Sequence, residues 1–163
     1  MRHCLTPILV LALLLVSSCG FTLRGAANLP EQLQTLYLEG LDADSDAVRE
    51  MRRVLQNNRI NLLTTPETGT WRLGLGLEEN TERAISVNSN ARAGEYELTM
   101  SLPFQLRQGA RVVLGPEILS TSKVYLADPE NAVAKNEEAQ QIRDEMRREL
   151  VLQIVRRLQA VTL

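Results

Sequence analysis

Residues 95–106 read EYELTMSLPFQL, with apolar and polar side chains alternating from end to end. The apolar positions share one side of an extended chain: Tyr96, Leu98, Met100, Leu102, Phe104 and Leu106. Residues 71–77 (WRLGLGL) repeat the pattern, with one face made of Trp71, Leu73, Leu75 and Leu77. A period of two is typical of strands that bury one face of a sheet. The sequence therefore predicts two strands, each with one apolar face.

The segments beside these strands are typical of turns. Residues 88–94 (NSNARAG) are small and polar and fit the tip of a long hairpin. Gln108-Gly109-Ala110 predicts a tight turn into a third long strand at about 112–126, interrupted near Gly115-Pro116 and stopped by Asp128-Pro129. The order of these elements favours three long antiparallel strands.

A long helix is expected at the C-terminal end, from about residue 132 to 159. Apolar side chains recur there at four-residue steps, widened by two valines: Ile142, Met146, Leu150, Val151, Ile154, Val155 and Leu158. The opposite side is densely charged. One apolar stripe and one charged face are what a helix lying on a sheet needs.

The N-terminal half predicts a strand, a helix and a second short strand. Leu36-Tyr37-Leu38 is the first strand, and Ile60 to Leu63 the second. Between them, Ser45 or Asp46 can cap a helix that ends at Asn57-Asn58. The fold class is therefore α+β, with two helices packed on one face of a four- to five-stranded, largely antiparallel sheet.

The N-terminus has the pattern of a lipoprotein signal. Arg2 and His3 precede an apolar run from Leu5 to Val16 that is too short to cross a bilayer as a helix. Val16-Ser-Ser-Cys19-Gly20 resembles the lipobox cut by the lipoprotein signal peptidase. We expect residues 1–18 to be removed and residues 19–163 to form one periplasmic domain anchored by lipidated Cys19. A plain signal peptide, or a buried helix that ends in cysteine, are the alternatives.

Lipidation decides where the chain resides. Each buried methylene contributes about 0.8 kcal/mol, so two or three acyl chains on one cysteine are an essentially permanent anchor. Lipoproteins kept in the inner membrane commonly carry aspartate after the cysteine, whereas this chain has Gly20. The resemblance to bacterial lipoproteins therefore implies that this chain is exported to the outer membrane.

Removal of the signal segment also removes reactive side chains from the mature chain. Cys4 and His3 lie in the discarded segment and Cys19 is blocked by lipid, which excludes Cys/His zinc sites and Ser-His-Asp or Cys-His nucleophiles. Loss of Arg2 changes the formal charge from −2 to −3, because 17 basic residues then face 20 acidic ones. Nothing offers the basic face that nucleic-acid binding requires. We expect no metal and no cofactor.

Several polar groups have a structural and a functional interpretation. Residues 42–46 (DADSD) look like the start of a calcium loop, but Ala47 and Arg53 occupy the positions that need glycine and glutamate. A helix start is the better interpretation. Gly74 and Gly76 are explained by sheet twist, or by another surface that passes close to the strand. A carboxylate pair for hydrolysis could come from four residues, although nothing fixes their separation: Glu78, Glu79, Glu95 and Glu97.

Arg92, at the hairpin tip, and Lys135, before the last helix, each lie in a loop with few acids immediately beside them. Either could contact a phosphate, and either could simply be solvated.

Three motifs in order resemble the LPS-assembly lipoprotein family LptE, over essentially the whole mature chain. They are residues 19–25 (CGFTLRG), residues 93–98 (AGEYEL) and Asp128-Pro129 leading to residues 134–137 (AKNE). The resemblance implies a protein that is not an enzyme. Members plug the lumen of the outer-membrane β-barrel LptD, help it fold and help it pass lipopolysaccharide to the outer leaflet. They are also held to bind lipopolysaccharide through basic residues.

Lys135 matches one such basic position. The second lies in the hairpin tip, where Ser89 stands nearest the family's arginine and Arg92 follows three residues later. A different function is also possible from the sequence: an anchored periplasmic protein that binds lipid or peptidoglycan and has no barrel partner. Such a protein would need an apolar pocket. A carboxylate-based hydrolase is a third.

Overall fold

The structure is a computed structural model that describes residues 29–87, 93–126 and 132–162. It contains a short 3-10 helix (Glu31–Leu33) and the following elements in chain order: β1 (Thr35–Gly40), α2 (Asp46–Asn57), β2 (Asn61–Leu62), β3 (Trp71–Leu75), β4 (Glu79–Val87), β5 (Ala93–Gln108), β6 (Arg111–Leu126) and α3 (Ala132–Gln159). The signal segment (residues 1–18) and the lipobox around Cys19 lie outside the described residues.

The start of α2 follows the prediction. Ser45 is the N-cap, and its hydroxyl accepts a hydrogen bond from the backbone N–H of Val48 at 3.4 Å. The Asp42 carboxylate accepts the backbone N–H of Asp44 at 3.1 Å. The acidic segment thus forms a capped helix start rather than a calcium loop. The helix ends at Asn57, and Arg59 then adopts a left-handed backbone with φ of 62°.

The fold class is confirmed as α+β, and the sheet is mixed. Within the described residues it has six strands, with the order β2-β1-β3-β5 and with β4 and β6 also paired to β5. β1 is parallel to β2 and β3, while β5 is antiparallel to its three partners. β3 and β4 follow each other along one edge of β5, because β3 pairs with residues 104–108 and β4 with residues 93–101.

The gap between β3 and β4 corrects one prediction. Trp71, Leu73 and Leu75 share a face as expected, but Leu77 is 57% exposed. The alternation fails because the ladder stops opposite Pro103, whose nitrogen cannot donate a hydrogen bond. The Gly76 N–H instead donates to the Pro103 carbonyl at 2.8 Å, and a Cβ on Gly76 would lie 2.8 Å from the proline Cβ. Glycine at this position is therefore explained by close approach.

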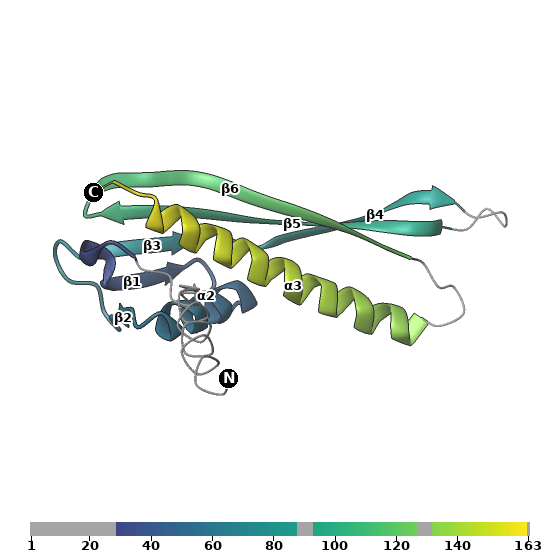
Figure 1. The fold of residues 1–163 in the computed structure, drawn as a ribbon, viewed down its shortest axis with the longest axis horizontal. Coiled ribbons are helices and arrows are strands. Elements are labelled where there is room, and N and C mark those ends of the chain that lie inside the picture. Colours follow the sequence, from purple (N-terminus) through teal and green to yellow (C-terminus); the bar gives the residue numbers. More distant parts are fainter. Residues whose placement is uncertain (1–28, 88–92, 127–131, 163) are drawn as a thin grey trace, which may run out of the picture.

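β5 and β6 form the long hairpin that runs the length of the molecule (Figure 1). The predicted turn is present, with Gly109 at a φ of 59°. The predicted interruption near Gly115-Pro116 appears as a shift of register between Phe104 and Arg107, and the strand continues past it. The even positions of β5 from Leu98 to Leu106 are buried, as the sequence predicts.

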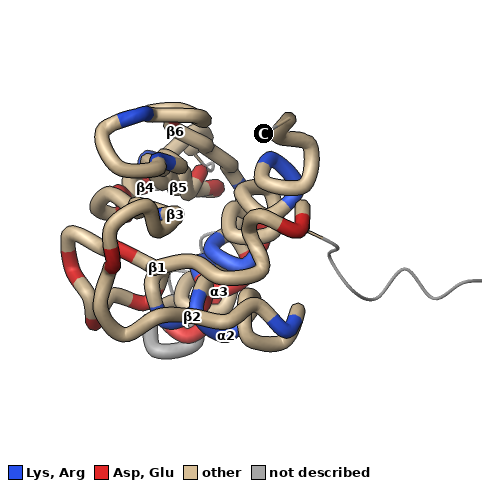
Figure 2. Tube along the Cα trace, turned by 90° about the vertical axis from the view of Figure 1, so that its left-hand side faces the viewer, with Lys and Arg blue, Asp and Glu red and all other residues tan. Residues whose placement is uncertain are grey.

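Both helices cover the same face of the sheet, as expected (Figures 1 and 2). The predicted stripe of α3 is buried, except that Ile142 is only partly covered. Two regions result. We call β1, β2, β3 and α2, with the end of α3 over them, the body. We call β4, residues 93–103 of β5, residues 117–126 of β6 and the first half of α3 the arm, which extends away from the body (Figure 1).

Candidate functional site

The far end of the arm is formed by the ends of β4 and β6 and the starts of β5 and α3. β4 ends at Val87 and β5 begins at Ala93, and these two residues are paired. β6 ends at Leu126, opposite Glu95, and α3 begins at Ala132 (Figure 1). The described residues on either side of 88–92 and the first turn of α3, which contains Lys135, therefore lie at the same end of the molecule.

The side chains themselves stay untested. Arg92 and Cys19 lie outside the described residues. Lys135 falls in the first turn of α3 rather than in a loop before it, and its side chain is not described. The contacts of all three residues remain predictions.

In the arm, α3 is flanked by opposite charges. On the side of β4, Arg143 lies 3.3 Å from a Glu82 carboxylate oxygen. On the side of β6, the Lys123 ammonium donates to Glu145 at 2.6 Å. Because positions four apart stack on one helix face, arginines 143 and 147 form one flank and glutamates 145 and 149 form the other. Opposite signs on the two flanks set the rotation of the helix on the sheet.

Arg147 is the buried centre of the first flank. Its Nε and Nη2 donate to the two carboxylate oxygens of Glu78 at 2.7 and 2.9 Å, and its Nη1 donates to Asp144 at 2.6 Å. Only 8% of the Arg147 side chain and 12% of the Glu78 side chain are exposed. Burial opposes the charge of Arg147, but the hydrogen bonds to Glu78 and Asp144 outweigh it and raise the pKa overall. This bidentate pair joins α3 to the gap between β3 and β4.

Tyr125 lies on the same side of α3, nearer the far end of the arm, and like Arg143 it contacts Glu82. Burial comes first among the causes that raise its pKa to about 12, followed by its hydrogen bond to Glu82. The hydroxyl donates to Glu82 at 2.9 Å, and the ring stacks on Tyr96 with centroids 5.6 Å apart. At neutral pH the hydroxyl is protonated and serves as a donor. The sequence analysis missed both Arg147 and Tyr125, because a single charge or aromatic in an amphipathic pattern does not reveal its partner across the sheet.

The face of the arm opposite the helices carries small polar side chains. The strand register sets Thr81, Thr99 and Ser122 in one row, and Glu79, Ser101 and Ser120 in the next. A third row pairs Arg83 with Glu97 at 2.7 Å. This helix-free face therefore carries hydroxyl groups along its middle rows, one paired arginine, and exposed apolar side chains on β6.

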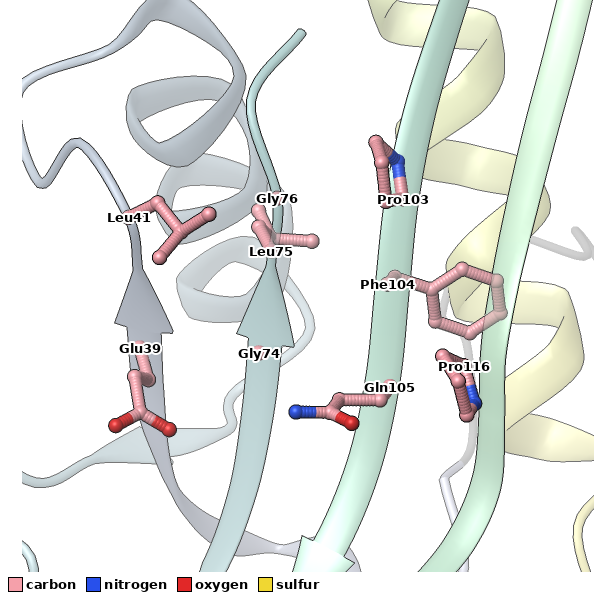
Figure 3. Close-up of a pocket in the computed structure, with 9 residues that line it drawn as sticks. All are labelled: Glu39, Leu41, Gly74, Leu75, Gly76, Pro103, Phe104, Gln105 and Pro116. Atoms are coloured by element: carbon pink, nitrogen blue, oxygen red, sulfur yellow. The ribbon is translucent and has the colours of Figure 1, made fainter.

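A shallow groove of about 270 Å³ lies where the body meets the arm (Figure 3). Gly74 and Gly76 form its floor, and Leu41, Pro103 and Pro116 are among its walls. A Cβ on Gly74 would lie 3.2 Å from the Gln105 Cγ. The surface that passes close to these glycines is thus the neighbouring strand β5 of the same chain.

Two of the four glutamates considered for hydrolysis are paired with arginines. Glu78 is held by Arg147 inside the seam, and Glu97 pairs with Arg83 on the helix-free face. The described ranges contain no group of three or more Asp, Glu, His or Cys residues placed to hold a metal ion. Among the described helices, none is both long and apolar enough to cross a bilayer.

Comparison with known proteins supports the resemblance. The family model LptE, described as lipopolysaccharide-assembly, matches residues 33–158. The LPS-assembly lipoprotein LptE of Yersinia pestis (strain Pestoides F) is 32% identical over 165 residues, which cover 99% of this chain and 78% of that protein. The protein of the same name from Yersinia pseudotuberculosis serotype O:1b gives the same values.

Two solved structures share the fold. Rare lipoprotein B from Shewanella oneidensis superposes with a TM-score of 0.70 at 22% identity, covering 76% of this chain and 92% of that chain. Lipoprotein B from Nitrosomonas europaea superposes with a TM-score of 0.72 at 20% identity, covering 86% and 91%. The family model and the Yersinia relatives together show that this chain belongs to the LptE family of lipopolysaccharide-assembly lipoproteins.

Proposed function

We propose that the chain is a lipid-anchored outer-membrane lipoprotein that plugs and assists assembly of the lipopolysaccharide-translocating β-barrel LptD. The observation that carries the proposal is the family match over residues 33–158 together with 32% identity to proteins named for lipopolysaccharide assembly. The anchor is Cys19, left as the first residue once residues 1–18 are removed. The function involves no enzymatic step and no cofactor.

The arm supports this function. The lumen of an outer-membrane barrel is polar, and a plug must present polar groups to it. The rows of hydroxyl groups on the helix-free face meet that requirement, and Arg83 is neutralised there by Glu97. The alternative of an anchored lipid or peptidoglycan binder receives less support, because the groove at Gly74 and Gly76 is shallow and open.

The assembly role is tested by depletion of the lipoprotein. Folded β-barrels migrate differently from unfolded ones on gels when samples are not heated, so the folded fraction of the barrel can be followed directly. We expect that fraction to fall on depletion and to be restored by the wild-type chain. Expression of Cys19→Ala, which removes the lipidated residue, should restore it less well. A barrel that folds normally without the lipoprotein would refute the proposal.

Lipopolysaccharide contact is assigned to Arg92 and Lys135, at the far end of the arm. Lipid A phosphates need local cations, and charge-assisted hydrogen bonds from such residues are the strong ones. Arg92→Asp combined with Lys135→Asp should weaken lipopolysaccharide binding and leave the barrel complex intact. Arg83→Asp is the control, because Arg83 is a basic residue of the arm that is already paired. Equal binding by the wild type and the double variant would remove both residues from the site.

A further inference from the structure

Within the described part of the chain, the sheet of the arm ends in two edge strands, and the two edges differ. β4 and β6 each pair with β5 alone among the described strands. The β4 edge has two register shifts between Ala84 and Val87, and its helix-free face carries Glu79 and Arg83. Bulges and charges are devices that keep a strand edge from pairing with another chain. The β4 edge is therefore protected.

Over residues 117–126 the β6 edge has no register shift and no charge on its helix-free face. Its register against β5 is unbroken from Glu117, opposite Phe104, to Leu126, opposite Glu95. The side chains on its helix-free face are all uncharged: Ile118, Ser120, Ser122, Val124 and Leu126. The three apolar ones are 70%, 54% and 70% exposed. Lys123 points to the other face, where Glu145 holds it.

The backbone of this segment has pairing capacity left. In an antiparallel pair, alternate residues direct their N–H and C=O groups away from the partner strand. Apart from the ladder with β5, no backbone–backbone hydrogen bond joins residues 111–126 to another described residue. A regular strand edge that keeps outward backbone groups available and carries no charge on its helix-free face is a template for an added strand.

We propose that residues 117–126 of β6 receive an edge strand of the partner barrel before that barrel closes. The inference rests on the function proposed above. A barrel strand has about 9–11 residues, and the regular part of β6 has the same length. Barrel strands carry apolar side chains on one face. β6 likewise exposes Ile118, Val124 and Leu126 on its helix-free face, with two serines between them. An unclosed barrel has free edges, and a closed one has none.

A lysine on the uncharged face of β6 tests this proposal in the full-length lipoprotein. Val124→Lys places a charge on the helix-free face of the edge strand that would receive the added strand, whereas Thr81→Lys makes the matched change on the protected β4 edge. We expect newly made barrel to enter the folded complex about tenfold more slowly with Val124→Lys, and at the wild-type rate with Thr81→Lys. Because Val124 is 54% exposed and Thr81 is also exposed, both variants should unfold at the wild-type temperature. Equal rates for the two variants would overturn the inference.

A photoreactive side chain placed at Ser122 or Thr81 identifies the occupant. We expect adducts with newly made barrel from position 122 before the barrel folds, and none from position 81 at that stage. Adducts only between two copies of the lipoprotein, or early barrel adducts from both positions alike, would overturn the inference while leaving the proposed function intact. If the wild-type lipoprotein neither captures the barrel nor affects its folding, the proposed function itself fails.

Discussion

The body and the arm use the same helix and the same long hairpin, but different forces hold them. In the body, α2 and the end of α3 bury a continuous apolar layer against β1, β3 and β5. In the arm, a narrower apolar seam is bordered on both sides by charged and hydroxyl groups, from Arg147 with Glu78 to Lys123 with Glu145. Hydrophobic burial is large and non-directional, whereas ion pairs are directional and individually weak.

Most of the buried apolar side chains therefore lie in the body rather than in the arm. The body supplies most of the free energy of folding, because that energy scales with the apolar area removed from water. The flanking charges of the arm set the position of α3, and the apolar side chains on the helix-free face of β6 are exposed. Four substitutions test this division, and the largest effects should lie in the body.

Leu55→Ala in the body should have the largest effect. Leu55 is fully buried in α2. Truncation of such a leucine leaves a cavity and lowers the free energy of unfolding by about 3–5 kcal/mol. Denaturant unfolding of the soluble domain measures it. A loss below about 1 kcal/mol would contradict the assignment of stability to the body.

Arg147→Met, at the junction of body and arm, should cost about 2 kcal/mol, because it removes the cation from the almost buried Glu78 carboxylate and leaves it only the amide hydrogen bond from Asn80. The double variant Arg147→Met, Glu78→Leu should recover much of the loss, since an apolar pair can replace a buried ion pair. A double-mutant cycle by denaturant unfolding gives the coupling. Strictly additive losses would show that the pair does not act as a unit.

Gly76→Ala should cost about 1–2 kcal/mol, because the new Cβ would lie 2.8 Å from the rigid ring of Pro103. Gly74→Ala is the matched control. Its Cβ would meet the flexible side chain of Gln105 at 3.2 Å, so the loss should be smaller. Thermal unfolding of the two variants compares them, and a reversed order would contradict the role assigned to close approach at Pro103.

Lys123→Gln in the arm should have the smallest effect on stability. The hydrogen bond from Lys123 comes first among the causes that lower the pKa of Glu145, and the lysine's charge comes second. A carboxylate whose pKa is lowered in the folded state adds stability above its unfolded pKa and loses it as the pH falls through the folded value. NMR titration should show the Glu145 pKa rising in the variant. An unchanged value would show that the pair does not form in solution.

Much of the fold could be predicted because periodic patterns report burial directly. The period of two in β5 and the four-residue steps in α3 identified the right faces. The separate strand β4 was not predicted, because its side chains are exposed and it lacks an apolar face. The parallel pairing of β1 with β2 and β3 was not predicted either, since it joins segments distant in sequence.

The candidate site was harder to predict. Sequence reasoning placed Leu77 on the buried face, and the structure turns Glu78 inward instead, where it meets Arg147. That exchange depends on Pro103, more than twenty positions away in the chain, which stops the ladder. The pattern of residues 71–78 alone could not reveal the contact between Glu78 and Arg147, because these residues are distant in the sequence. Arg92, Lys135 and Cys19 were singled out by local sequence and resemblance, and they remain predictions.

The central claim is that this lipoprotein works as the partner of a β-barrel. Gentle detergent extraction of the tagged native chain, followed by mass spectrometry of what co-purifies and of the mass of the intact complex, tests it most directly. We expect one large outer-membrane β-barrel at equal stoichiometry, with the lipoprotein protected from added protease. A monomeric lipoprotein, with no barrel at that stoichiometry, would contradict the account.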